Sequence, residues 1–124
     1  MRYMCLIYEA NDPTGQPDPA VQKADMDAYA AFTNEVVAAG VMVSGDALLP
    51  PAMATSVRVD SAGETLTTDG PFAETKEWLA GFYILECDNL DQAIEYAAKI
   101  PSAAHGTIEV RPVMELPEEY RSNG

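Results

Sequence analysis

The sequence has few basic residues and few residues of the types that bind metals. Of its 124 residues, 7 are Lys or Arg and 20 are Asp or Glu, so the formal net charge is −13. A surface this negative repels phosphate backbones and anionic lipids, and we expect no nucleic-acid and no membrane partner. There are 2 cysteines and 1 histidine, with no Cys-X-X-Cys pair, so no zinc site is expected and we predict no cofactor.

Long apolar runs are also missing. None reaches the ~18–20 residues that a membrane-spanning helix needs. The residues from Met1 to Glu9 become polar too soon for a signal peptide, so a cytoplasmic protein is predicted. Cys5 and Cys87 lie in apolar surroundings, which favours buried reduced thiols over a disulfide. No GxGxxG, P-loop or GxSxG motif is present, so the sequence gives no support for nucleotide binding or a serine nucleophile.

What the sequence does contain is a regular alternation of strand and helix patterns within a length typical of one domain. A first helix is predicted to begin at Asp18-Pro19 and end at Gly40, and a second is capped by Asn89 and stopped by Pro101. Strands are predicted over 2–9, 41–48, 56–60, 64–68, 81–87 and 107–113. Asp60–Gly63 supplies a hairpin turn between the third and fourth strands.

The predicted order is β-α-β, hairpin, β-α-β, which is the ferredoxin-like split βαβ pattern of an α+β protein with an inserted β-hairpin. Right-handed crossovers place both helices on one face of the sheet. The strands over 2–9 and 81–87 are apolar on both faces, so a second surface has to cover the other side. A second copy of the chain is the simplest cover, and we predict a homodimer.

Three segments carry a resemblance to a known family. They are Thr68–Glu77 (TDGPFAETKE), Met1–Tyr8 (MRYMCLIY) and His105–Pro112 (HGTIEVRP). Together they resemble the YCII-related family, in its DGPF-domain branch, over residues 1–114, with 115–124 as an acidic tail. The resemblance implies a ferredoxin-like subunit within a dimeric α+β barrel. It also implies a setting beside extracytoplasmic-function sigma factors for several members.

The wider family includes a dehydrochlorinase that acts on a hydroxylated aromatic ring with a proposed His–Asp dyad. The resemblance places that dyad at His105 and Asp69. His105 is the sole histidine, so imidazole chemistry near neutral pH has to use it. A surface or capping histidine is the alternative. Asp69 can equally serve only as a turn residue whose carboxylate accepts backbone N–H bonds.

Six further residues are candidate ligand contacts, each with a structural alternative. Tyr8 and Trp78 suit an aromatic wall or plain packing, and Phe72 suits a core position better than ring stacking. Glu74 and Lys76 follow the DGPF turn, where they hold a polar ligand or form a solvated ion pair; in a helical turn Glu74 would share a face with Glu77. Arg111 binds a carboxylate, or pairs with charges such as Glu109 and Glu86 at an interface.

These patterns leave three hypotheses for function. The first is a small enzyme that binds a polar or hydroxyaromatic molecule and performs proton transfer or elimination without a cofactor. The second is a ligand-binding or regulatory module without chemistry, linked to sigma-factor signalling. The third is a metal-free oxygenase acting on its own substrate, which oxygen consumption with a phenol would distinguish from the first.

Overall fold

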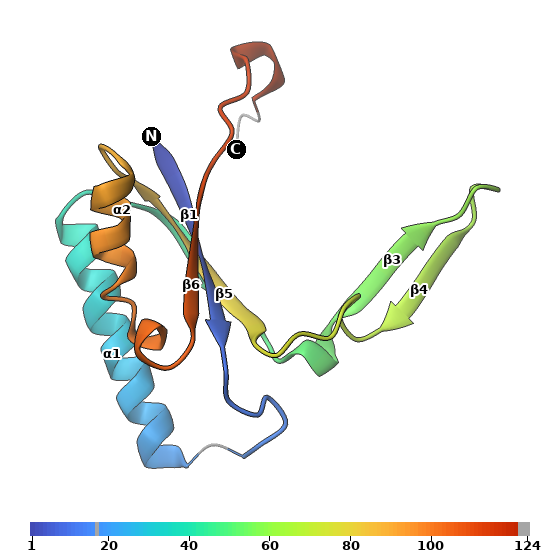
Figure 1. Ribbon diagram of the computed structural model, residues 1–124, viewed down its shortest axis with the longest axis horizontal. Coiled ribbons are helices and arrows are strands. Elements are labelled where there is room, and N and C mark those ends of the chain that lie inside the picture. Colours follow the sequence, from blue (N-terminus) through green and yellow to red (C-terminus); the bar gives the residue numbers. More distant parts are fainter. Residues whose placement is uncertain (17, 122–124) are drawn as a thin grey trace.

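The computed structural model describes residues 1–16 and 18–121, and these fold into one four-stranded sheet, one two-stranded sheet and two α-helices (Figure 1). The strands are β1 (Arg2–Glu9), β2 (Met42–Ala47), β3 (Thr55–Val59), β4 (Thr65–Asp69), β5 (Trp78–Glu86) and β6 (Thr107–Pro112). The α-helices are α1 (Pro19–Ala38) and α2 (Leu90–Ala97), and the 3₁₀ turns are η1 (Pro51–Met53), η2 (Pro101–Ala104) and η3 (Glu118–Tyr120). Within the described residues, neither α-helix is long and apolar enough to cross a membrane.

The main sheet has the strand order β2-β5-β1-β6, with β1 and β5 in the centre and every pair antiparallel. Both helices lie on the same side of this sheet (Figure 1). The α+β class and the element order predicted from the sequence are therefore confirmed, and the arrangement is compatible with a ferredoxin-like fold. The pairing of β2 with β5 is irregular in register between Met42 and Ser44.

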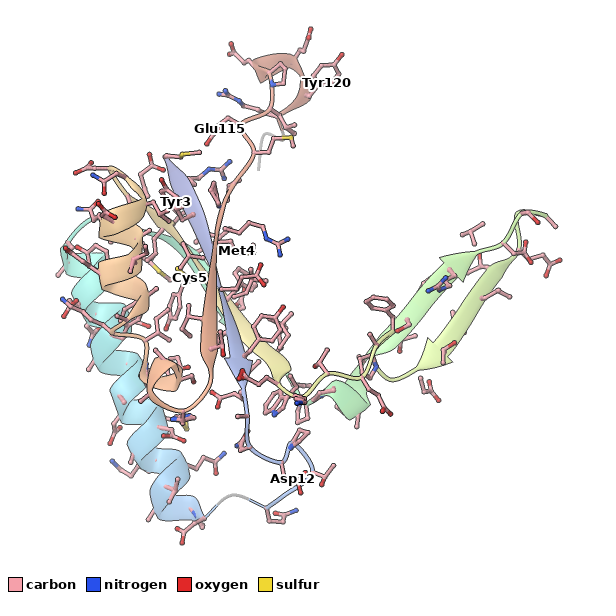
Figure 2. The ribbon with its side chains drawn as sticks, viewed as in Figure 1. Tyr3, Met4, Cys5, Asp12, Glu115 and Tyr120 are labelled. Carbon is pink, nitrogen blue, oxygen red and sulfur yellow. The ribbon has the colours of Figure 1, made fainter. Side chains whose placement is uncertain are left out.

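The core lies between the sheet and the two helices. Tyr3, Cys5 and Ile7 alternate along β1 and are buried on the helix side, whereas Met4 lies on the opposite face (Figure 2). Leu85 of β5 is also buried beside them. Successive side chains of a strand point to opposite faces of the sheet, so alternate residues face the helices and the others face the open side. Both cysteines are free and buried, as predicted.

The helix boundaries follow from their caps. The Asp18 side chain accepts a hydrogen bond from the Ala20 backbone N–H, and Asn89 accepts one from Gln92. Gly40 takes the left-handed backbone (φ 74°) that ends α1. The buried residues of α1 are Phe32 and Val36, both in its C-terminal half. The reason is geometric: the N-terminal half of α1 extends past the end of the sheet (Figure 1).

Strands β3 and β4 pair only with each other and form an arm that points away from the main sheet (Figure 1). The predicted hairpin is confirmed, one residue earlier in β3 and one later in β4, and Asp60 accepts hydrogen bonds from the Ala62 and Glu64 backbone N–H groups in its turn. Every residue of β4 is exposed. The arm therefore contributes nothing to the core of its own chain.

The C-terminal segment also leaves the body of the protein. Glu115 and Tyr120 lie beyond the end of the sheet opposite to the base of the arm (Figure 2). Of the predicted acidic tail, residues 122–124 lie outside the described part, as does Pro17 of the predicted loop between β1 and α1. Val113, just after β6, still lies beside β1, because its backbone N–H donates a hydrogen bond to the Arg2 carbonyl at 3.0 Å.

Candidate functional site

Four polar side chains form a continuous chain of contacts at one end of the main sheet. The His105 Nε2 atom lies 3.2 Å from Glu9 Oε2, the Ser102 hydroxyl donates to the other oxygen of Glu9, and the Tyr29 hydroxyl contacts Ser102 Oγ. A carboxylate can only accept, so the Ser102 proton points to Glu9 and the Tyr29 hydroxyl donates to Ser102. We refer to these four residues as the Glu9 network.

The members of the Glu9 network come from β1, from α1 and from η2 with the residue that follows it. Glu9 is the last residue of β1, just past a register shift against β5, and its side chain is 15% exposed. Tyr29 lies on α1, and Ser102, 1% exposed, follows Pro101 in η2. His105 follows η2 directly, and its side chain is 54% exposed. The network therefore runs from solvent at the imidazole to the interior at Ser102.

Gly106 makes this arrangement sterically feasible. Its backbone N–H donates to the Ser102 carbonyl at 2.7 Å, which closes the turn between η2 and β6. A Cβ atom at this position would lie 2.1 Å from the carbonyl oxygen of Tyr8, far inside van der Waals contact. Because only glycine allows β6 to start this close to the end of β1, the imidazole of the preceding residue is held beside Glu9.

A cavity of about 250 Å³ opens next to the network, between α1 and the sheet. Its lining residues are Ile7, Glu9, Tyr29, Thr33, Met42, Gly45, Asp46, Ala47, Ala80, Gly81, Phe82 and Tyr83. The Tyr83 hydroxyl and Thr33 Oγ1 lie 2.8 Å apart, and the Tyr83 ring packs edge-on against Phe32. Burial raises the pKa of the Tyr29 phenol, an effect only partly opposed by its hydrogen bond to Ser102, so this group stays neutral.

The structure does not bring the predicted dyad together. Asp69 is the last residue of β4, opposite Thr55 at the base of the arm, and the carboxylate beside His105 is that of Glu9. Within residues 1–16 and 18–121, no hydrogen bond or ion pair joins Asp69 to His105. Gly70 follows with φ 94° and donates to the Ala54 carbonyl at 2.7 Å. Within the described residues the Asp69 carboxylate accepts none of the backbone hydrogen bonds that the turn interpretation expected.

Five of the six predicted ligand residues lie together in a second depression of about 810 Å³, which we call the arm-base groove. They are Tyr8, Phe72, Glu74, Lys76 and Trp78. The prediction that Phe72 packs in the core is wrong, since this ring is 80% exposed. Residues 71–77 form bends and no helical turn, so Glu74 and Glu77 share no helix face; instead Glu77 accepts a hydrogen bond from Thr107.

Two of the six candidates, Trp78 and Arg111, have partners within the chain. The Trp78 indole N–H donates to the Asn11 carbonyl and side-chain oxygens at 3.0 and 3.2 Å, which ties the start of the loop after β1 to β5. Arg111 lies outside the groove and pairs with Glu109 on the same face of β6. Such an exposed pair within one strand contributes little to stability, so Arg111 has no assigned ligand role in this arrangement.

Sequence reasoning missed Glu9, Ser102 and Tyr29. Glu9 offered one signal, a charge at the end of a strand that is otherwise apolar, and Ser102 offered another in following the proline that stops α2. Their spacing in the sequence does not reveal the network, since only tertiary packing brings β1, α1 and η2 together. Among the described residues, no group of three or more His, Cys, Asp and Glu side chains is arranged to hold a metal ion.

The fold and the network define a small α+β protein with a helix-covered cavity at one end of an antiparallel sheet. Comparison with protein families matches the YCII-related domain over residues 1–117, and the chain belongs to this family. It is also similar to an uncharacterized protein of Rhizobium meliloti (strain 1021). The two are 37% identical over 115 residues, which covers 91% of this chain and 92% of that protein.

Proposed function

We propose that the protein binds a small polar or hydroxyaromatic molecule in the cavity between α1 and the sheet, and that Glu9 and His105 exchange a proton with it. The observation that carries this proposal is the Glu9 network, which joins a cavity-lining carboxylate to a solvent-exposed imidazole. In this proposal Glu9 takes the place of Asp69 as the carboxylate partner of His105. No cofactor takes part in the proposed step.

The chemistry follows from the order of the groups. A ligand hydroxyl that reaches Glu9 transfers its proton to the carboxylate, and the ligand oxygen keeps the electron pair. With Nε2 unprotonated, the exposed imidazole of His105 takes the proton from the other carboxylate oxygen at Nε2 and releases its Nδ1 proton to water. Ser102 holds Glu9 in place through its own hydroxyl. The result is general acid–base catalysis of proton transfer or elimination, with the carboxylate positioned by hydrogen bonds on both oxygens.

The alternative is a ligand-binding or regulatory module without turnover. The two are separated by titrating 4-hydroxyphenyl compounds into the protein and following amide shifts by NMR, together with hydrogen–deuterium exchange into the ligand. We expect binding in wild type, with exchange slowed about 10²-fold or more in Glu9→Gln and His105→Ala. Asp69→Asn is the comparison variant: if it impairs exchange more than Glu9→Gln does, the resemblance-based dyad is right and the Glu9 network is not the site. Binding without exchange favours the regulatory module.

We further propose that two copies pair through the open face of the main sheet, as in a dimeric α+β barrel. Met4, Leu6, Phe82 and Ile84 lie on this face, and each is half-buried in the single chain. Leaving apolar area in water is unfavourable by about 2.5 kcal/mol per 100 Å². Sedimentation velocity is expected to give about twice the mass of one chain. Leu6→Glu is expected to yield monomer, whereas Val21→Glu on the exposed start of α1 is the matched control.

Two finer assignments accompany this proposal. The segment Asp69–Phe72 reads DGPF, which supports membership of the DGPF-domain branch. The two buried free thiols suit a reducing compartment, which supports a cytoplasmic location.

A further inference from the structure

Two exposed apolar features of the chain lie at opposite ends of the main sheet. At one end, the arm-base groove presents Leu49, Met53 and Phe72, each at least 68% exposed. At the other end, residues 114–121, which we call the tail segment, leave the body of the protein (Figure 2). We propose that the tail segment of one copy binds in the arm-base groove of a second copy; this inference rests on the proposed pairing of two copies through the open face.

The tail segment has few partners in its own chain. Met114 and Tyr120 are 77% and 69% exposed, and no residue of η3 is buried. Within the part of the chain that the structure describes, the one ion pair between the tail segment and the body joins Glu115 to Arg2 at 3.6 Å, and both side chains are exposed. Large apolar side chains that stand clear of their own core gain free energy when a second surface covers them.

The tail segment is poorly placed to fill the groove of its own chain. It starts beside Arg2, whereas the groove begins at Tyr8, ~20 Å farther along β1 at ~3.3 Å per residue. To reach that groove, the segment would have to reverse direction after Val113, give up the η3 turn and run extended along the open face. A second copy supplies a groove without this reversal.

The groove is continuous with the open face of the main sheet. The alternation in β1 that places Met4 and Leu6 on this face places Tyr8 there too. Tyr8 and its β5 partner Leu79 also line the groove. When two sheets pack face to face about a two-fold axis perpendicular to their strands, each is turned end for end relative to the other. The tail segment of each copy then lies over the groove end of its partner, and the contact is made twice.

The charges of the two surfaces are complementary. Lys76 is the one basic residue among the groove-lining residues, and within the described residues it forms no ion pair. The tail segment brings Glu118 and Glu119 next to its exposed tyrosine. The groove also contains Glu74, for which the tail segment brings Arg121. Opposite charges at the rim of an apolar contact fix its register and its partner more than its affinity.

The test measures dimer dissociation together with the environment of Trp78, which lines the groove and is the single tryptophan. A dilution series of the full chain is followed by sedimentation equilibrium and by tryptophan emission. We expect Tyr120→Ala to weaken the dimer about tenfold or more and to shift the emission to longer wavelength, because an aromatic anchor is lost and the groove is opened to water. Met26→Ala, which removes a similarly exposed side chain from α1, should change neither reading.

Charge reversal tests the same contact from the side of the groove. Lys76→Glu should weaken the dimer about threefold or more, and Glu118→Lys with Glu119→Lys in the same chain should restore it. Lys23→Glu, which reverses the charge of an exposed lysine on α1, is the matched control.

The other outcomes separate this contact from the pairing on which it rests. A dimer that dissociates equally in wild type, Tyr120→Ala and Lys76→Glu overturns the tail–groove contact, while pairing through the open face stands. A Tyr120→Ala emission shift that persists when Leu6→Glu has made the protein monomeric places the tail segment in its own groove and overturns the contact between copies. A monomeric wild type at micromolar concentration overturns both, whereas the proposed function of the cavity depends on the exchange experiment alone.

Discussion

The substitution Ser102→Ala tests whether the Glu9 network is a structural unit. Ser102 is 1% exposed, donates to the Glu9 carboxylate and accepts from Tyr29. A hydrogen bond to a charged group contributes about 1.5–3 kcal/mol and a neutral one about 0.5–1.5 kcal/mol. Removing the hydroxyl deletes both, and Tyr29 and Glu9 are accessible enough to recover some bonding with water. We therefore expect the free energy of unfolding to fall by about 2–4 kcal/mol, a large share of the ~5–15 kcal/mol of a typical domain.

The assay is urea unfolding followed by far-UV circular dichroism and by fluorescence of Trp78, the single tryptophan. The midpoint should shift while the slope stays constant, because the folded architecture is retained. Ser44→Ala is the matched control, since Ser44 is exposed on β2, and it should change stability by less than about 0.5 kcal/mol.

Coupling between the two hydroxyls gives the sharper result. Because Tyr29→Phe removes one of the bonds that Ser102→Ala also removes, the double variant should lose less stability than the sum of the two single losses. A Ser102→Ala protein within about 0.5 kcal/mol of wild type would show that the hydroxyl makes no such bonds, and the network would lose its support.

Three other predictions concern the frame around the site. Gly106→Ala places a Cβ 2.1 Å from the Tyr8 carbonyl oxygen and should destabilise the protein by about 1–3 kcal/mol or more in urea unfolding, whereas Gly15→Ala, with 3.5 Å of clearance, should not. Burial, reinforced by Cys87, raises the pKa of Cys5 to about 11 from 9.0, so between these values the unfolded chain loses a proton that the folded chain keeps. Stability should therefore fall as pH rises from 9 to 11, by up to about 1.4 kcal/mol per pH unit, and Cys5→Ala should flatten this slope; an unchanged slope would contradict the burial argument. Replacing residues 55–69 with a short Gly-Ser turn should leave helical circular dichroism and thiol burial intact, since β3 and β4 pair only with each other, and unfolding of the shortened chain would contradict this separation.

Much of the scaffold could be predicted because it depends on local patterns. The alternation in Tyr3-Met4-Cys5 sets which residues face the core, Asp18 and Asn89 cap helices with their own side chains, and Asp60 to Gly63 make a tight turn. Each of these features involves residues within a few positions of one another. Hence neither sheet order nor any partner was needed to place them.

The site itself could not be predicted in the same way. The family resemblance correctly selected His105 as a residue in contact with a carboxylate, but the partner is Glu9, 96 positions earlier in the chain. Phe72 was expected in the core because aromatic rings usually are buried, yet its segment connects the arm to β5 and lines the open arm-base groove. Whether a side chain is buried depends on the residues that pack against it. Those residues come from other segments of the chain, so one segment of sequence does not determine burial.

The sequence by itself determined the strands, the helix ends, the negative charge and the family, because these follow from side-chain chemistry over short distances, from the residue counts or from short sequence segments. The tertiary structure alone decided that Glu9, Tyr29, Ser102 and His105 meet, and that the hairpin stands clear of the core. The physical reason is that antiparallel pairing of β1 with β5 and β6 brings distant residues to one edge. Which residues meet there is set by register and by the space that Gly106 leaves open.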